Sequence, residues 1–250
     1  MNGTLTQTLK ELRLSGMAQS LEVRIQEASG NRLNPLEFLE IALQDELAVR
    51  RQRSIERRMK AACFRELRSL EDFDWSFNSS IPRARIFELA TCQFLRERRD
   101  LLFLGPPGVG KSHLCQGLGR QAVKLGYKVL YRSIFDLVED FLRDESFLEG
   151  DRVMDRYLKP DLLIIDDMGM KQLQKRAGEY LFEVILRRHE KQSTAMTSNR
   201  PIEDWGMLLQ DVPTATAILD RFLQHAEILT LQGRSYRLKD RAVETAAVKA

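Results

Sequence analysis

The chain has 250 residues, of which 43% are hydrophobic and 30% charged, and its formal net charge is +3. This composition supports a packed core, in one large domain or in a moderate domain with a small accessory unit. Three widely spaced cysteines without a C-x-x-C pair argue against a disulfide framework and against structural zinc. No uncharged apolar run approaches a membrane span, and the first residues carry charge where a signal sequence needs an apolar block. We therefore expect a cytoplasmic protein with no membrane partner.

Residues 1–70 are predicted to form a helical N-terminal domain that binds DNA or a partner protein. Apolar residues recur there at helical spacing, with breaks expected at Gly16 and at the Gly30-Asn31 pair. The stretch NPLE that begins at Asn34 is typical of a helix start, with Asn34 as N-cap and Glu37 as the reciprocal capping residue. A long helix is expected to run from this point through an arginine-rich cluster.

This cluster holds eight basic and two acidic residues between Ala48 and Arg68. On a helix that turns about 100° per residue, the eight bases cover roughly half of the circumference. Because guanidinium groups suit phosphate and acids are few, the pattern predicts sequence-independent binding of duplex DNA. A solvated helix face is the alternative interpretation. The residues of this helix assigned to DNA are Arg50, Arg51, Arg53, Arg57, Arg58 and Lys60.

Residues 71–82 are predicted to be a linker because acids, aromatics, Ser, Asn and Pro replace the helical pattern. The main domain then covers residues 83–240, and residues 241–250 are expected to be a loose tail. The main domain should begin with a helix near 83–98, after which helices and strands alternate. The strands are expected at 101–105, 128–132, 161–166, 193–198 and 227–231, and the helices between them at 111–125, 134–148 and 177–190. Continuous apolar strands separated by helices predict an α/β fold, a three-layer arrangement with a mostly parallel sheet covered on both faces.

The stretch GPPGVGKS, from Gly105 to Ser112, fits the pattern G-x-x-x-x-G-K-[ST]. Its glycines let backbone N–H groups surround phosphate oxygens at the positive end of the following helix. Lys111 is expected to reach the β- and γ-phosphates of ATP, and Ser112 to hold Mg²⁺. A tight turn without a ligand is disfavoured, because an apolar strand precedes the motif and an amphipathic helix follows it. The residues assigned to the nucleotide here are Gly105, Pro106, Pro107, Gly108, Val109, Gly110, Lys111, Ser112 and His113, the last through packing or an indirect contact.

A second motif, LLIIDD, ends in Asp166 and Asp167. An acid at the end of a buried strand beside a P-loop is where a partner of Mg²⁺ belongs, so Asp166 is assigned to the metal, directly or through water. Asp167 is expected to polarise the attacking water. An apolar run that ends in acids is a weak signal alone and a strong one beside a P-loop.

Together with the later segment TSNRP at 197–201, these motifs resemble those of an AAA+ ATPase. The chain is most similar to the IstB-like transposition helper ATPases, which are similar to DnaC-type helicase loaders, and the likeness covers nearly its whole length. The resemblance implies sensor 1 at Asn199 and an arginine finger at Arg221 that reaches the nucleotide of a neighbouring subunit. Arg237 is a weaker candidate for a second sensor. For Arg221 the alternative is a surface ion pair with Asp220 or Glu227.

The chain departs from the AAA+ pattern in two places. It carries Asp167 where these enzymes usually have glutamate, and aspartate is shorter by one methylene. Slow hydrolysis, or a shifted backbone that compensates, is therefore expected. Only about fifty residues follow Asn199, too few for the usual C-terminal lid domain. Helicase-loader relatives also lack this domain, so we expect none here.

The resemblance implies an ATPase that forms a ring or helical homo-oligomer on double-stranded DNA and assists a partner transposase in selecting and remodelling target DNA, without cutting it. Lys171, Lys175 and Arg176 are expected to line an inner DNA path. The alternatives are a replicative helicase loader, a nucleotide-dependent DNA scaffold with little hydrolysis, and a small-molecule kinase. His189 and His225 lie far apart in sequence and are not expected to form a metal site.

Overall fold

A computed structural model describes residues 3–147, 150–169 and 176–239, except for the side chains of residues 144–151. The chain folds as two units, residues 1–57 and 58–250. The division falls before the boundary expected at residue 70, because the intervening residues pack on the second unit. The Tyr131 amide donates to the Ala62 carbonyl at 2.8 Å, and the Glu66 amide donates to the Gln116 side chain at 3.1 Å. We call residues 58–250 the ATPase unit and residues 1–57 the N-terminal unit.

Three helices build the N-terminal unit: α1 (Gly3–Glu11), α2 (Ser15–Asn31) and α3 (Pro35–Ala61), whose last residues belong to the ATPase unit. The expected capping residues begin α3. Asn34 Oδ1 accepts hydrogen bonds from the amides of residues 36 and 37 at 2.9 and 3.0 Å, and the Glu37 carboxylate accepts one from the Asn34 amide at 2.8 Å.

Two expectations for these helices are wrong. Gly16 does not break the chain but lies inside α2, where a Cβ would come within 2.9 Å of backbone atoms of α3. The break precedes it, at Arg13, which has a φ of 55°. In addition, α3 ends at Ala61 and Cys63 has a φ of 56°, so Arg65 and Arg68 lie beyond the helix.

A five-stranded parallel sheet forms the centre of the ATPase unit, in the order β2-β3-β4-β1-β5. Its strands agree with the expected ones: β1 (Asp100–Leu104), β2 (Val129–Ser133), β3 (Leu162–Met168), β4 (Ser193–Ser198) and β5 (Ala226–Thr230). The central strands β1 and β3 are largely apolar, and β4 is fully buried although four of its six residues are Ser or Thr, as expected for strands that helices cover on both faces.

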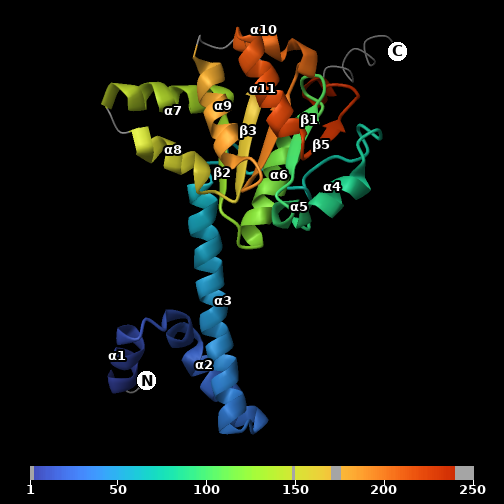
Figure 1. Cartoon of the computed structure of the whole chain (residues 1–250). Coiled ribbons are helices and arrows are strands. Elements are labelled where there is room, and N and C mark those ends of the chain that lie inside the picture. The colour runs from blue at the N-terminus through green and yellow to red at the C-terminus, as the bar shows by residue number, and fades with distance from the viewer. Residues whose placement is uncertain (1–2, 148–149, 170–175, 240–250) are drawn as a thin grey trace. The chain divides into compact units, whose positions relative to one another are not determined.

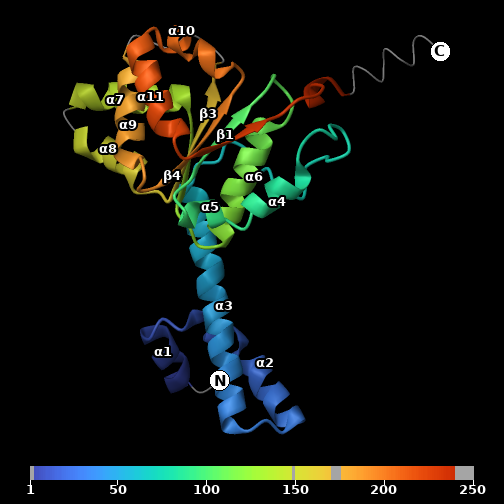
Figure 2. The same ribbon diagram turned by 45° about the vertical axis from the view of Figure 1, so that its right-hand side comes forward.

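Helices α4 (Arg83–Leu89), α5 (Gln93–Arg96) and α6 (Lys111–Lys124) lie on one side of the sheet, as Figures 1 and 2 show. The other side carries α7 (Ile134–Phe147), α8 (Gly150–Leu158), α9 (Ala177–Arg188), α10 (Trp205–Leu209) and α11 (Val212–Leu223). Between this second layer and the sheet lies a large apolar core that includes the fully buried Trp205, Tyr157 and Phe222. The three-layer parallel α/β fold is therefore confirmed.

Smaller differences concern the helices. The helix expected over 83–98 is divided into α4 and α5 at Cys92, which has a φ of 60°. Helix α8 was not expected, and 3₁₀ helix η1 (Ile202–Asp204) precedes α10. Between β5 and residue 239 the described structure contains 3₁₀ helix η2 (Tyr236–Leu238). Among the described helices, none combines the length and the apolar character needed to span a membrane.

Candidate functional site

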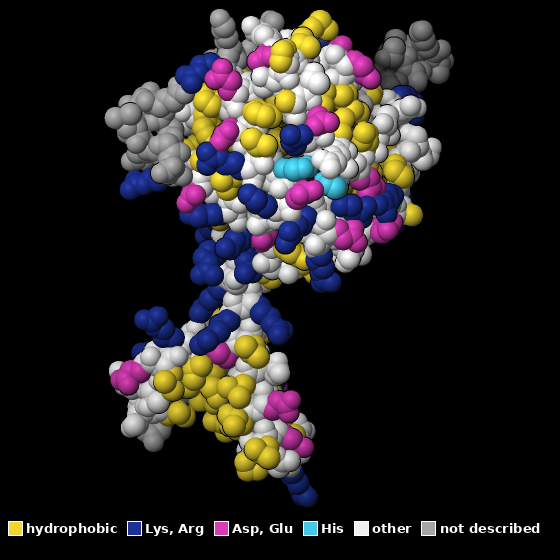
Figure 3. Space-filling model, in the orientation of Figure 1, with side chains coloured by type: hydrophobic (Ala, Val, Ile, Leu, Met, Phe, Trp, Pro, Cys, Tyr) yellow, Lys and Arg dark blue, Asp and Glu magenta, His cyan; other side chains and the backbone are white. Residues whose placement is uncertain are grey.

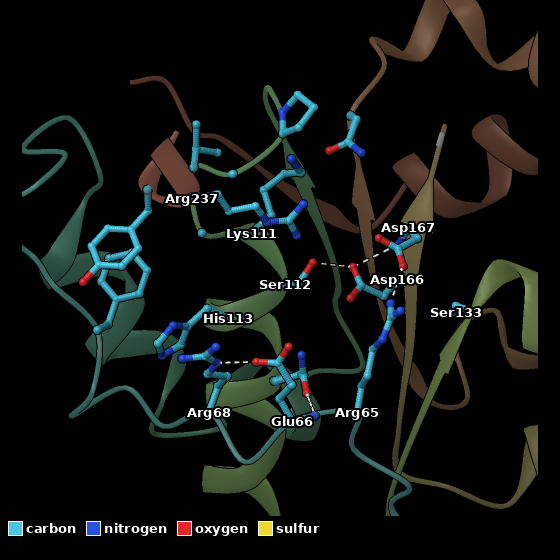
Figure 4. Close-up of a pocket in the computed structure, with 18 of the residues that line it drawn as sticks. Arg65, Glu66, Arg68, Lys111, Ser112, His113, Ser133, Asp166, Asp167 and Arg237 are labelled. Carbon is cyan, nitrogen blue, oxygen red and sulfur yellow. Dashed lines mark hydrogen bonds and ion pairs between the residues drawn. The ribbon is translucent and has the colours of Figure 1, made fainter. Parts of the chain in front are cut away.

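A pocket of about 1010 Å³ opens in the ATPase unit at the carboxyl ends of β1, β3 and β4. The P-loop lines it from Pro107 to Ser112, and Asp166, Asp167 and Asn199 line it from the strand ends. Other walls come from the segment over residues 63–78, from the end of β2 and the start of α7, and from Tyr236 and Arg237 of η2 (Figure 4). Parallel α/β sheets bind ligands at this edge, outside the carboxyl ends of the strands.

The P-loop connects β1 to α6 and needs its glycines for local conformation. Gly105 and Gly110 have φ values of 150° and 107°, in the region that favours glycine. A Cβ on Gly105 would lie 2.2 Å from the Leu231 carbonyl oxygen, and one on Gly110 would lie 2.6 Å from the Phe73 ring. The loop therefore packs against neighbouring segments while α6 begins at Lys111, which directs free backbone N–H groups toward the pocket.

Lys111 is buried, with 5% of its surface exposed. Its ammonium donates to the carbonyl oxygens of Gly105 and Pro106 at 2.7 and 2.8 Å, so these two residues contact the lysine rather than line the pocket. Burial lowers the pKa of Lys111 to about 8; Asp166 opposes this shift and Arg237 adds to it. A phosphate group beside this ammonium would stabilise its charged form.

Asp166 lies at the centre of a hydrogen-bond network beneath the P-loop. Its carboxylate accepts hydrogen bonds from the Ser112 hydroxyl at 2.8 Å, from the Tyr131 hydroxyl at 2.5 Å, and from the Thr197 hydroxyl. Burial and the adjacent Asp166 charge raise the pKa of Tyr131, which keeps this phenol a donor. The hydroxyl and carboxylate oxygens of Ser112 and Asp166 are the ligand types that Mg²⁺ prefers, so the two residues fit the metal they were assigned.

Asp167 occupies a distorted part of β3. Its φ is 64°, and the register between β3 and β4 shifts between Ile165 and Met168. Such a bulge redirects a side chain relative to a regular strand. The half-buried Asp167 carboxylate pairs with the Arg65 guanidinium at 3.1 Å. Burial and Asp166 raise the pKa of Asp167, and Arg65 opposes the shift.

Other predicted residues divide between the pocket and the surface. Asn199 and Arg237 line the pocket. His113 also lines it, with Nε2 2.7 Å from the Ser69 carbonyl oxygen and its ring edge-on to Phe73, in the packing role expected. Arg221 lies outside the pocket on α11 and pairs with Asp220 at 2.6 Å, the ion pair named as its alternative.

The residues assigned to DNA also differ in their surroundings. The guanidinium of Arg50 pairs with Glu46 at 2.6 Å and donates to the Arg13 carbonyl at 3.2 Å, and that of Arg53 donates to the Ser15 hydroxyl. Both therefore hold the N-terminal unit together. Within the described part of the chain, no side-chain hydrogen bond or ion pair engages the exposed Arg51 or Arg57.

Arg58 and Lys60 follow on the last turn of α3, in the ATPase unit. Lys171 and Lys175 lie outside the described residues. Arg176 precedes α9, pairs with Glu179 at 3.3 Å and lies over the Tyr180 ring.

One wall of the pocket was not predicted from the sequence. Residues 63–78, divided there between a DNA-binding helix and a linker, contribute a stretch that closes the site on one side. It brings two aromatic rings, Phe73 and Phe77, and Tyr236 of η2 meets Phe77 edge-on with ring centroids 5.0 Å apart. Asn78 fastens the stretch by hydrogen bonds to the backbone of Arg234 at 3.0 and 3.1 Å. Alternating acids and aromatics in LEDFDWSF were the signal that could have indicated it.

Two histidines that are far apart in the sequence, His189 and His225, meet at the opposite edge of the sheet. The ligating atoms of His189, Glu190 and His225 all lie within 4.8 Å of one another. His225 Nε2 lies 3.1 Å from the Glu190 carboxylate, and Arg98 donates to the Glu190 carbonyl at 3.1 Å. An exposed histidine–glutamate pair accounts for this arrangement.

The parallel sheet, the P-loop at its carboxyl edge and the adjacent acids define an AAA+ P-loop protein. Residues 7–244 match the model of the family described as IstB-like ATP binding protein, so the chain belongs to this family of ATP-binding proteins. The resemblance noted from its motifs is thereby confirmed.

Two relatives carry names that refer to insertion sequences and to ATP binding. One, of insertion sequence IS5376 from Geobacillus stearothermophilus, is 35% identical over 93% of this chain and 93% of its own length. The other, of IS21 from Pseudomonas aeruginosa, is 36% identical over 93% of this chain and 88% of its own. The crystal structure of the DnaC helicase loader is similar in fold, with a TM-score of 0.52 and 19% identity over 60% of this chain and 88% of that chain.

Proposed function

We propose that this protein is a Mg²⁺-dependent ATPase that oligomerises on duplex DNA and assists the transposase of an insertion sequence. The observation that carries the proposal is the convergence of Lys111, Ser112, Asp166 and Asp167 in one pocket beside a P-loop. Family membership supports ATP as the ligand. The names of the relatives support a role in an insertion sequence.

In this proposal each residue of the pocket has a separate role in ATP hydrolysis. The amides that begin α6 and the Lys111 ammonium hold the phosphates of ATP. The aromatic rings of Phe73 and Phe77 offer apolar surface to its adenine ring. Ser112 and Asp166 hold Mg²⁺, which neutralises phosphate charge when bound. Asp167 accepts the proton of the attacking water, and the bulge in β3 compensates for its short side chain.

Two further residues, Asn199 and Arg221, are assigned to completing the site around the γ-phosphate. The Asn199 amide orients the water or the γ-phosphate, because an amide both donates and accepts hydrogen bonds. Arg221 acts in the site of a neighbouring subunit, which agrees with its exposed position outside its own pocket. Loss of the γ-phosphate then weakens the contact between subunits and loosens the assembly.

Hydrolysis is tested by comparing Asp167→Asn with the wild type, with and without duplex DNA. The variant should keep its affinity for a non-hydrolysable ATP analogue and lose at least about 100-fold in phosphate release, as general-base catalysis contributes roughly 10²–10⁴-fold. Glu139→Gln, which removes an exposed acid of α7 outside the pocket, is the control. Undiminished turnover in Asp167→Asn would exclude this carboxylate as the base. A wild type that releases no phosphate would support the scaffold instead.

Duplex DNA is assigned to α3, where Lys and Arg side chains gather in Figure 3. Replacing Arg51 and Arg57 together with Gln should weaken DNA binding and reduce the slope of log affinity against log salt by roughly 2, because each phosphate contact contributes about 0.9. These two positions are chosen because Arg50 and Arg53 stabilise the N-terminal unit. The control replaces two arginines of other helices that form ion pairs there, in the double variant Arg143→Gln and Arg187→Gln. An unchanged slope would place the DNA elsewhere.

A replicative helicase loader is the second candidate, because the DnaC loader shares this fold. Both candidates use the same ATPase residues, so only the partner distinguishes them. Purified wild-type protein, loaded with the ATP analogue on duplex DNA, should retain the transposase of an IS21-type element and not a replicative helicase. Retention of the helicase alone would favour the loader.

A further inference from the structure

The ion pair between Arg65 and Asp167 joins two parts of the chain that have different proposed roles. Figure 4 shows Arg65 reaching from the segment after α3 toward Asp167 at the end of β3. The two atoms that make the contact, Arg65 Nη1 and Asp167 Oδ2, are 3.1 Å apart. Asp167 is the proposed base, so a cation beside it influences turnover.

The backbone around Arg65 is fixed by hydrogen bonds, but its exposed guanidinium can exchange Asp167 for another anion. On either side of Arg65, the Ala62 carbonyl is bonded to β2 and the Glu66 amide to α6, which fixes the backbone at the pocket rim. The Arg65 side chain is 67% exposed, whereas that of Asp167 is 20% exposed. A single hydrogen bond from an exposed guanidinium has a small net free energy, so another anion can replace the carboxylate.

Duplex DNA is the anion that the position of Arg65 favours. Arg65 follows the end of α3 closely, and the bases of its last turn, Arg58 and Lys60, belong to the same unit. DNA bound along these bases presents phosphates at about 1.7 Å per charge along its axis, so further phosphates lie beyond those they contact. Guanidinium binds phosphate and carboxylate with the same geometry.

We propose that the Arg65 guanidinium is shared between Asp167 and a phosphate of bound duplex DNA, so that DNA releases Asp167 and thereby stimulates turnover. Arg65 is thus a positioning residue for the proposed base. This inference rests on the proposed ATPase and DNA-binding functions. Coupling through one shared group is reciprocal: what weakens the ion pair strengthens the phosphate contact, and the reverse.

The reciprocal effect is measured without hydrolysis, as the salt dependence of duplex DNA binding in the absence of nucleotide. Asp167→Asn should tighten binding about threefold and steepen the slope by about 0.9, one phosphate contact, because Arg65 is freed. In an Arg65→Gln background, Asp167→Asn should change neither quantity. Asp72→Asn is the control for simple loss of negative charge, since this exposed acid lines the same pocket without pairing with Arg65. Equal effects of Asp72→Asn and Asp167→Asn would overturn the proposal.

Turnover supplies the second measurement. Arg65→Gln should raise DNA-independent phosphate release and reduce stimulation by DNA at least about threefold, with the affinity for the ATP analogue within about twofold of wild type. Arg65→Lys, which keeps the charge, should restore part of the DNA response. Arg68→Gln is the matched control, because this neighbouring arginine lines the pocket but pairs with Glu66.

The outcomes separate this inference from the function on which it rests. Stimulation by DNA that persists unchanged in Arg65→Gln would contradict the role of Arg65 alone. At least tenfold weaker binding of the ATP analogue would assign Arg65 to the nucleotide and also overturn the proposal. A wild type that neither binds duplex DNA nor hydrolyses ATP would instead contradict the proposed function.

Discussion

The two edges of the central sheet both hold buried charges, but they satisfy them differently. At the amino edge, the fully buried Arg188 donates to the carbonyl oxygens of Tyr157 at 2.8 Å, Pro160 at 3.0 Å and Ser193 at 2.5 Å. Burial lowers the pKa of Arg188 to about 10, and nearby Asp100 opposes the shift, so the side chain remains a cation at neutral pH. Arg188 is 1% exposed and lies outside the pocket, so no ligand reaches its guanidinium to replace these acceptors.

At the carboxyl edge, Lys111 also donates to two carbonyl oxygens, but they belong to a glycine-rich loop that borders the pocket. Asp167 is paired with a mostly exposed arginine. The partners of these charges can therefore be exchanged for phosphate, whereas those of Arg188 cannot. A buried charge thus indicates a binding site only where its partners are replaceable, and burial alone does not distinguish the two edges.

The largest effect is expected at the amino edge. Arg188→Met keeps most of the apolar stem and removes the donors of three carbonyl groups, which should lower the free energy of unfolding of the ATPase unit by about 4 kcal/mol. Arg187→Met is the control, because this neighbour is exposed and pairs with Glu183 at the surface, and it should cost about 0.5 kcal/mol or less. Denaturant unfolding measures both. Equal losses in the two variants would show that the buried network contributes nothing specific.

At the carboxyl edge the expected loss is in binding rather than in stability. Lys111→Ala should weaken binding of ATP at least about 100-fold, or about 2.7 kcal/mol, because a charge-assisted contact to phosphate disappears. Unfolding should change by about 1 kcal/mol or less, since a buried cation that costs desolvation is removed with it. Lys124→Ala, at the exposed end of the same helix, is the control. Calorimetric titration that finds wild-type affinity in Lys111→Ala would refute the assignment of the pocket.

Most of the fold could be predicted from the sequence because its signals are local. The five strands are short runs between helical segments, and the P-loop and the acids of β3 have fixed spacings, so pattern and motif located them within a residue or two. The start of α3 at Asn34 was equally readable from its capping residues. Its end at Ala61 was not, because no glycine or proline marks the turn at Cys63.

Contacts between distant segments could not be predicted in this way. The stretch that contains Arg65 and Phe73 has a composition typical of a linker, yet it forms a wall of the pocket because its apolar side chains cover α6. The pairing of Arg65 with Asp167 joins residues about a hundred positions apart, and no pattern in either segment indicates it. The resemblance to a known family located the catalytic motifs and likewise gave no information on this wall.

The smallest expected effect concerns the hydroxyl groups that hold Asp166 in place. Tyr131→Phe removes one buried donor to this carboxylate, and substitutions at such supporting residues typically cost about 10- to 100-fold in metal affinity. We expect the lower limit, about tenfold more Mg²⁺ for half-maximal binding of the ATP analogue, because Ser112 and Thr197 still donate to Asp166. A titration with Mg²⁺ at fixed analogue measures it.

Tyr157→Phe provides the matched control for this prediction. Its hydroxyl also donates a hydrogen bond to a carboxylate, that of Asp140. This pair joins α8 to α7 and lies outside the pocket. Both variants lose one phenolic hydrogen bond, so both should lose a similar amount of stability, about 1 kcal/mol. Only Tyr131→Phe should change the Mg²⁺ requirement. A similar rise of the Mg²⁺ requirement in Tyr157→Phe would mean that losing any buried phenolic hydrogen bond disturbs the pocket through the core. The distinction between fixed and replaceable partners would then not apply to single hydrogen bonds.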